Sequence, residues 1–338
     1  IALRYTLLSI AGVILGGGEF VGGRVSPIGA VIGALTLTLA GASPGGLWTL
    51  LGAGLDSAAK QIAPGSTITY QTTGGGFANA AIVSEGRAEI GLIHDAELAI
   101  AVAGGEPFRG PIENLRTIAY LYDWAPMQFI ASRNFAERHG ITSLADFART
   151  EAPVRITINR AGNITGQVAS AMLEAAGADD AAIRSWGGTV ITAGSSEQSG
   201  LLMNGRVDIF TNGVFVGHSS IREIENAIDM TVLDIPENVR QVVAERFGIG
   251  MFTIPAGSYE NQDSPVETVA LGAVLIASDA MDDETAYTLT RALIENTGTI
   301  QGVHPAMAGF NHDLMTRQTM APLHDGALRA YREAGLVQ

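Results

Sequence analysis

The chain contains no cysteine, which excludes disulfides, thiolate metal ligands, cysteine nucleophiles and a lipid attached through cysteine. Charged residues are also few, at 16% of 338 residues, with 20 Lys and Arg against 34 Asp and Glu. The formal net charge of −14 makes broad binding to nucleic acid or to an anionic membrane surface unfavourable. Hydrophobic residues make up 47%, enough for the cores of about two domains, and the 42 glycines suggest many tight turns and backbone-lined sites.

We expect the chain to lack three common enzyme motifs: the G-x-S-x-G nucleophile elbow, the G-x-x-x-x-G-K-[ST] phosphate loop and the H-E-x-x-H zinc motif. His94, followed by Asp95 at the end of a predicted strand, is the best-placed acid–base candidate, but a ligand hydrogen bond or a local cap explains this pair equally well. The acidic run at residues 282–284 is typical of a helix N-terminus. We therefore predict a protein that is not an enzyme, with no catalytic residue, no metal site and no cofactor.

The first residues form a short apolar segment. Arg4 precedes the run Tyr5 to Leu15, which three glycines follow. A positive residue before an apolar stretch of roughly 7–15 residues is typical of a secretory signal. The run falls short of the roughly 20 residues that cross a bilayer. Residues 1–34 are therefore predicted to be an N-terminal extension or the remnant of a signal peptide, with a buried extra strand as the alternative.

From residue 34 onward, strand and helix patterns alternate in two runs. The first run has predicted strands at Leu35–Leu39, Thr67–Thr72 and Glu89–Ile93, and predicted helices at Trp48–Ile62 and Phe77–Glu85. The second run has predicted strands at Val154–Ile158, Thr189–Thr192, Val207–Thr211 and Met230–Ile235, and predicted helices at Gln167–Ala176, Glu197–Met203, Ser219–Ala227 and Asn238–Phe247. Repeated strand–helix units predict mostly parallel sheets covered by helices, so the fold class is α/β with two lobes.

Strand-like segments at Thr117–Tyr122, Met127–Ser132 and Thr268–Ala277 are suited to carry the chain between the lobes. The last of these precedes a clear helix at Asp283–Thr297. Such a crossover makes one lobe discontinuous and leaves a ligand cleft between the two. The predicted lobes are residues 35–128 with 273–338 (lobe I) and residues 129–272 (lobe II).

Three predicted strands end in loops rich in Gly, Ser, Thr or Asn, at Ser43–Gly46, Thr72–Gly76 and Gly162–Gly166. In open α/β sheets, ligands lie at the carboxyl ends of the strands. The N-terminus of the helix that follows offers unpaired N–H groups and a positive dipole end, which suit a carboxylate or a phosphate. The alternative for each loop is that it only caps its helix.

Four stretches carry a resemblance to a known family: LTLTLAGASPGG (35–46), TGGGFANAAIVSEGRAEIGLIHD (73–95), TIPAGSY (253–259) and LHDGALRAYREAG (323–335). From about Leu35 to Gly335 the chain resembles the TAXI-type solute receptors of tripartite ATP-independent periplasmic (TRAP) transporters. Two departures stand out. Asp325 replaces the family's usual proline, and Asn163-Ile164-Thr165 stands where the family more often has Ser-Gly-Thr.

The resemblance implies a two-lobe periplasmic-binding-protein fold (type II-like) that closes on a small solute. It implies a soluble periplasmic receptor that delivers the solute to TRAP membrane subunits driven by an ion gradient. The expected solute is an organic acid or amino acid, such as glutamate or 2-oxoglutarate. An enzyme on the same fold and a ligand-sensing module of a signalling protein are the alternatives.

Site residues are carried over by their place in the family's pattern. In the first lobe, Asp95 is expected to accept a hydrogen bond from the solute, beside backbone and hydroxyl donors at Ser43, Gly45, Gly46, Thr73 and Gly74. In the second lobe, Asn163 and Thr165 are expected to hold a carboxylate, with a further wall from Asn212, Gly213 and Phe215. Arg160 is the best-placed cation for an anionic solute, with Arg133 and Arg155 as alternatives.

Overall fold

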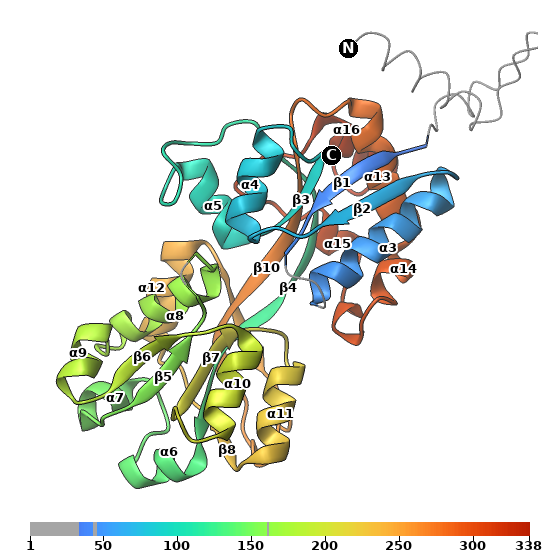
Figure 1. Cartoon of the computed structure of the whole chain (residues 1–338). Helices are drawn as coiled ribbons and strands as arrows, with labels where there is room; N and C mark the ends of the chain where they lie inside the picture. The colour runs from blue at the N-terminus through green and yellow to red at the C-terminus, as the bar shows by residue number, and fades with distance from the viewer. Residues whose placement is uncertain (1–33, 43–45, 161) are drawn as a thin grey trace, which may run out of the picture. The chain divides into compact units, whose positions relative to one another are not determined.

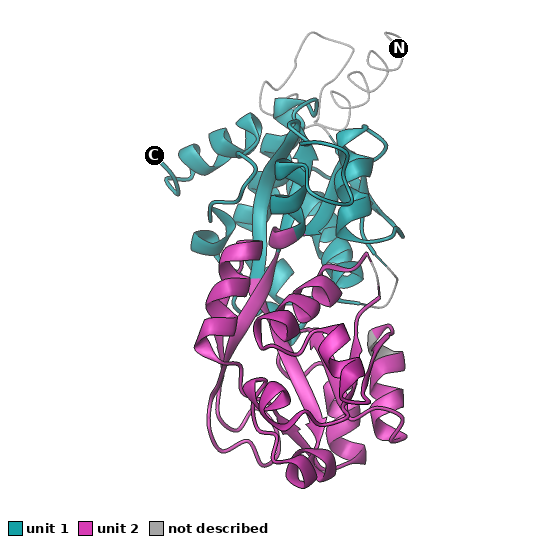
Figure 2. Cartoon of the chain, turned by 90° about the vertical axis from the view of Figure 1, so that its left-hand side faces the viewer, with its two compact units in different colours: residues 1–93, 97–122, 273–338 teal, residues 94–96, 123–272 magenta. Residues whose placement is uncertain are grey.

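The structure is a computed structural model that describes residues 34–42, 46–160 and 162–338. Residues 1–33 of the predicted N-terminal extension lie outside this part. The chain divides into two compact units (Figure 2). Unit 1 runs to Ile93 and also takes in Glu97–Tyr122 and Ala273–Gln338, and unit 2 comprises His94–Ala96 and Asp123–Gly272.

Unit 1 is built on three parallel strands, β1 (Thr36–Ala40), β2 (Thr67–Gln71) and β3 (Ile90–His94), in the order β2-β1-β3 with β10 beside β3. Alternate residues of β1 are buried, which places its leucines in the core. The helices of this part of the chain are α3 (Leu47–Ile62), α4 (Gly76–Ser84), α5 (Asp95–Ala103), α13 (Asp283–Glu295), α14 (Thr297–Gln301), η1 (Pro305–Met307), α15 (His312–Met315) and α16 (Asp325–Glu333) (Figure 1).

Unit 2 is built on β5 (Arg155–Ile158), β6 (Thr189–Thr192) and β7 (Ile209–Gly213), which are parallel. The order is β4-β7-β5-β6, and β4 runs antiparallel to β7. Two short strands add to the edges: β8 (Met230–Val232) pairs with β4, and β9 (Gly250–Ile254) pairs with β10. Its helices are α6 (Arg133–His139), α7 (Ala145–Thr150), α8 (Ile164–Ala175), α9 (Asp180–Ser185), α10 (Ser195–Met203), α11 (Ser219–Ala227) and α12 (Glu237–Phe247).

Two long strands belong to both units. β4 (Leu115–Ser132) and β10 (Val266–Ser278) each pass from one unit into the other (Figure 1). The sequence predicts two strands where β4 is one strand of 18 residues. The reason is the half-exposed pair Asp123-Trp124, which interrupts an otherwise buried run and resembles a loop in the sequence pattern.

Helix ends follow their capping residues. Asp282 caps α13 by accepting from the Thr285 amide at 3.1 Å, as the acidic run predicts. α8 begins at Ile164 instead of the predicted Gln167, because Asn163 caps it. His324 caps α16, so Asp325 is the first helical residue, a position where proline and an acidic residue are both favourable. The departure at Asp325 from the family's proline therefore fits the same helix start.

No helix in the described ranges is long and apolar enough to cross a membrane.

Candidate functional site

One buried side chain joins the end of β1 to β3 in unit 1. Nδ2 of Asn79, in α4, donates to the carbonyl of Gly41 at 2.7 Å and to that of Leu92 at 2.6 Å. The Thr73 hydroxyl lies 2.6 Å from the same Gly41 carbonyl and accepts from the Gly75 amide at 3.1 Å. The hydroxyl of the predicted ligand donor Thr73 therefore orders the loop.

A carboxylate of the protein itself lies at the start of α4. Glu97, in α5, is only 3% exposed, and a Cβ added to Gly76 would lie 1.7 Å from its Oε2. Gly76 is the first residue of α4, so a larger residue there would require the end of the Glu97 side chain to move. The helix N-terminus that we expected to receive the solute's carboxylate already has a carboxylate beside it.

The other predicted residues of this set are placed as follows. Ser43 and Gly45 lie outside the described residues. Gly46 directly precedes α3, and Gly74 is exposed in the loop before α4. Asp95 is the first residue of α5, and its Oδ1 accepts from the Ala96 amide at 2.8 Å. Of these residues, Thr73 is joined to the end of β1 by its bond to the Gly41 carbonyl.

The expectation that the chain lacks a G-x-S-x-G nucleophile elbow is wrong. Gly41 to Gly45 reads GASPG, which satisfies the G-x-S-x-G spacing of a nucleophile elbow, and it joins a strand to a helix as that motif requires. Ser43 itself lies outside the described residues. One specific observation therefore favours the enzyme alternative.

In unit 2, Asn163 and Thr165 lie together at the N-terminus of α8. Oδ1 of Asn163 accepts from the Thr165 amide at 2.9 Å and from the Thr165 hydroxyl at 2.7 Å. Thr165 is buried, whereas Asn163 is half-buried. Because its oxygen is occupied, the Asn163 side chain presents its amino group as a donor.

Asn212 and Gly213, at the end of β7, lie beside this helix start. A Cβ added to Gly213 would lie 3.0 Å from Cγ2 of Thr165, so the two segments approach closely. Oδ1 of Asn212 accepts from the Gly213 amide at 2.9 Å and from Nδ2 of Asn159 at 3.3 Å. The structure thus brings Asn163, Thr165, Asn212 and Gly213 together at the carboxyl edge of β5 and β7.

Asn159, the residue directly after β5, is a member of this group that the sequence analysis missed. Its Oδ1 accepts from the Arg160 amide at 2.8 Å. The side-chain oxygens of Asn159, Asn163 and Asn212 therefore all accept from the protein's own amides, and the Asn159 amino group donates in turn to Asn212. We name these residues the asparagine group. It offers hydrogen-bond donors, which suit a carboxylate or a carbonyl.

Phe215 follows β7 in the segment 214–218, which leads into α11. Its ring lies 5.0 Å from that of His218, which caps α11 by accepting from the Ser220 amide at 3.2 Å. Phe215 is half-buried. In the chain, Phe215 stands two residues after Gly213, the last residue of β7.

The candidate cations are engaged elsewhere. Arg160 pairs with Glu197 at 2.9 Å, and both side chains are more than half exposed. Arg155 begins β5, at the opposite edge from the asparagine group, where two hydrogen bonds to Asp208 raise its pKa. Arg133 follows the last residue of β4 and donates to the Met230 carbonyl at 2.9 Å. Since β4 is antiparallel to β7, Arg133 also lies at that opposite edge.

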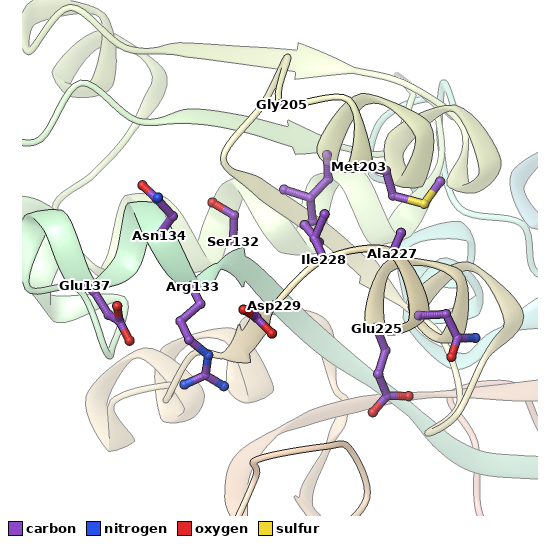
Figure 3. Close-up of a pocket in the computed structure, with 12 residues that line it drawn as sticks. Ser132, Arg133, Asn134, Glu137, Met203, Gly205, Glu225, Ala227, Ile228 and Asp229 are labelled. Carbon is purple, nitrogen blue, oxygen red and sulfur yellow. The ribbon is translucent and has the colours of Figure 1, made fainter.

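That opposite edge of unit 2 holds an open pocket of ≈ 680 Å³ (Figure 3). Arg133, Glu137, Glu225 and Asp229 are among the residues that line it. Arg133 and Glu137 lie in α6, Glu225 lies in α11, and Asp229 directly precedes β8. The pocket is thus separate from the asparagine group, and none of the predicted site residues other than the alternative Arg133 lines it.

In the described ranges, no three His, Asp or Glu side chains come together in a way that could hold a metal ion.

Solved structures with the same fold are periplasmic binding proteins. The chain is similar to the periplasmic binding protein BugD, with 13% identity and a TM-score of 0.53 over 90% of this chain and 98% of that chain. It is also similar to MatC from Rhodopseudomonas palustris with bound malate, with 14% identity and a TM-score of 0.53 over 90% of this chain and 99% of that chain. The predicted two-lobe periplasmic-binding-protein fold is thereby confirmed. Residues 39–335 match the family model described as NMT1-like, and the chain belongs to the NMT1-like family.

Proposed function

We propose that this protein is a solute receptor that binds a small carboxylate or amino acid through the asparagine group of unit 2. The observation that carries the proposal is the orientation of Asn159 and Asn163, whose oxygens are bonded to the protein's own amides. The Asn163 amino group remains as a donor beside a helix N-terminus, and Asn159 keeps a second N–H beyond the one that it donates to Asn212, a setting that favours an acceptor-rich anion. The solute's carboxylate is thus held by neutral donors.

The fold supports the same proposal. Periplasmic binding proteins include MatC, whose structure holds malate, a dicarboxylate. By the resemblance to TAXI-type receptors, we propose glutamate-like or 2-oxoglutarate-like solutes, delivery to TRAP membrane subunits, and a periplasmic location reached through a signal peptide at the N-terminus. The position of the solute between the two lobes stays a prediction.

The other site residues take roles in this proposal. Asp95 accepts from an amine or hydroxyl of the solute, and Phe215 with Gly213 forms an apolar and backbone wall. Thr73 and Glu97 have a structural role in unit 1. The Thr73 side chain orders the loop, and the Glu97 side chain lies against Gly76. The groups at Ser43, Gly45, Gly46 and Gly74 are proposed as backbone donors.

A thermal-shift panel of small carboxylates and amino acids tests the solute class. A solute present at a hundredfold excess over its dissociation constant stabilises the folded state by roughly 2.7 kcal/mol, which is a clear rise in Tm. Mass spectrometry of protein purified without refolding identifies a retained solute. The proposal is contradicted if sugars, cations or peptides shift the melt while carboxylates and amino acids leave it unchanged.

The enzyme alternative predicts a reactive serine at position 43. A fluorophosphonate probe and p-nitrophenyl acetate distinguish it from a receptor, with Ser43→Ala as the matched control. We expect no labelling and no turnover above that of the variant. Labelling that disappears in Ser43→Ala would establish a hydrolase on this fold.

A further inference from the structure

The motif Thr253–Tyr259 has no role in the proposed site, yet its last residue is one of the most enclosed polar groups of unit 2. Tyr259 is 3% exposed. Its hydroxyl donates to Oε1 of Gln128 at 2.6 Å and accepts from the Gly217 amide at 3.1 Å. The tyrosine therefore joins three segments that are distant in sequence.

Gln128 extends this contact to the other end of the same loop. It lies in β4, is 1% exposed, and pairs in register with Asn212. Its Nε2 donates to the Val214 carbonyl at 2.8 Å, which fixes the orientation of the amide. Tyr259 and Gln128 together bond to Val214 and to Gly217, the residues on either side of Phe215 and Val216.

The loop between these two bonds has no regular structure to hold it. Gly217 has a φ of +79°, in the region that favours glycine. The Val214 amide donates to the Pro126 carbonyl at 3.2 Å, while Gln128 and Tyr259 bond to the Val214 carbonyl and the Gly217 amide. These two side chains therefore help to set the position of Phe215, which lies between the two bonds.

Tyr259 is itself held from its other side. The Arg222 guanidinium lies 5.2 Å from the centre of its ring and donates to the Ser258 carbonyl at 3.1 Å. Arg222 also pairs with Glu225 at 2.6 Å, and Glu225 accepts from the Glu260 amide at 2.6 Å. Burial raises the pKa of Tyr259, so its hydroxyl keeps the proton that it donates to Gln128.

We propose that Tyr259, acting together with Gln128, is a positioning residue that sets the conformation of Val214–Gly217 and so places Phe215 for solute binding. The inference deepens the proposed function and rests on it for the link to the solute. The loop conformation itself does not depend on which solute binds. Two separate measurements therefore test the two parts.

Hydrogen exchange of the solute-free protein, followed by mass spectrometry, tests the positioning. In Tyr259→Phe, we expect exchange in the segment 214–218 to be about 3- to 10-fold faster, the range for loss of a buried hydrogen bond, with β7 unchanged. Gln128→Ala should act on the same segment. Tyr331→Phe is the matched control, since Tyr331 is a buried tyrosine of unit 1 whose hydroxyl donates to the Ile118 carbonyl at 2.9 Å. This control should leave the segment 214–218 unchanged.

Two results would overturn the positioning role. One is unchanged exchange in the segment 214–218 of Tyr259→Phe. The other is exchange that becomes faster throughout unit 2, which would mean that Tyr259 only contributes to global stability. Because no solute is present, neither result depends on the proposed function.

Calorimetry with L-glutamate, 2-oxoglutarate and malate tests the link to binding. For a compound that the wild type binds, Tyr259→Phe should raise Kd about 3- to 10-fold and Tyr331→Phe should leave it unchanged. An equal Kd in wild type and Tyr259→Phe, with faster exchange in the loop, would refute the link alone. Binding of none of the three compounds would count against the proposed solute class, and the exchange result would still decide the positioning.

Discussion

Units 1 and 2 end their parallel strands in loops of similar composition, but the two sets of loops use polar side chains differently. In unit 1, Asn79 and Thr73 bond to carbonyls of the loops themselves, and Glu97 abuts the start of α4. In unit 2, the side-chain oxygens of Asn159 and Asn163 accept from backbone amides, and the Asn159 amino group donates only to another side chain, that of Asn212. The polar composition of a loop therefore does not by itself show whether its side chains hold the loop together or bind a ligand.

The difference lies in whether donors or acceptors are satisfied within the protein. Asn79 donates twice to the backbone, whereas Asn163 accepts twice. An asparagine that donates inward acts as a tie between loops, and one that accepts inward offers its amino group outward. The predictions that follow test this contrast.

Asn79→Ala carries the largest expected effect, because it removes the tie of unit 1. The Gly41 and Leu92 carbonyls each lose the bond from Asn79, and a buried side chain is deleted. We expect the free energy of unfolding, measured by urea denaturation, to fall by about 2–4 kcal/mol. Asn204→Ala is the matched control, because its amide also donates to a carbonyl, that of Gly200 at 2.8 Å, from an exposed position. If both variants lose the same small amount of stability, Asn79 is not a tie.

Asn163→Asp tests the recognition surface of unit 2 without removing the helix cap. Aspartate caps a helix as well as asparagine does, so Tm should stay the same or rise. The amino donor is replaced by an anionic oxygen, and Kd for a carboxylate solute should rise about tenfold or more, which is roughly 1.4 kcal/mol. The control is Asp179→Asn, the reverse exchange at the exposed cap of α9. Unchanged Kd in Asn163→Asp would remove Asn163 from the site.

Much of the fold could be predicted from the sequence, because it depends on local patterns. β6 and α11 have the predicted limits, Thr189–Thr192 and Ser219–Ala227. Each of these two elements has, in the sequence, either a clear periodic pattern of apolar residues or a capping residue directly beside it. The sequence did not predict β9 (Gly250–Ile254). Its first four residues are alternately half-buried and exposed, and only the last one is buried, so the pattern of a buried strand is weak.

The candidate site could be predicted only in part, because side-chain roles depend on tertiary contacts. The family's pattern locates Asn163, Thr165, Asn212 and Gly213, and the structure brings them together. No local pattern shows that Glu97 packs against Gly76, 21 residues earlier, or that Arg155 pairs with Asp208. Asn159 could have been found, since it directly follows a predicted strand, as ligand-binding residues of α/β sheets do.

Acid should affect unit 2 through Asp146, in the first turn of α7. Burial raises the pKa of Asp146, but hydrogen bonds from the Thr142 and Ser143 amides and from Arg149 outweigh burial and lower it below its ordinary value of 3.8. A lowered pKa in the folded state stabilises the protein above that ordinary value, and the contribution is lost as the pH falls through the folded-state pKa. Asp146→Asn should therefore cost about 1–2 kcal/mol of unfolding free energy at pH 7 and progressively less below pH 3.8.

Urea denaturation at pH 7 and at pH 3 measures this difference. Asp263→Asn, at an exposed position, is the control and should show no such pH dependence. Unit 1 offers a counterpart in Asp56, whose pKa burial raises but Lys60 and the Ile68 amide lower more strongly. Equal losses for Asp146→Asn at the two pH values would show that its carboxylate is not ionised in a stabilising contact.

Arg160→Ala carries the smallest expected effect. It is the most direct test of whether unit 2 binds the solute's carboxylate through uncharged donors. Its ion pair with Glu197 is exposed on both sides, so its loss should change the free energy of unfolding by about 0.5 kcal/mol or less. If amide donors hold the solute's carboxylate, Kd should change by less than about threefold and should depend little on salt. Glu197→Gln, which releases the guanidinium, should likewise leave Kd nearly unchanged. A tenfold loss of affinity in Arg160→Ala with strong salt dependence would mean that the guanidinium exchanges Glu197 for the solute, so that recognition in unit 2 is ionic, because an amide donor alone cannot produce that dependence.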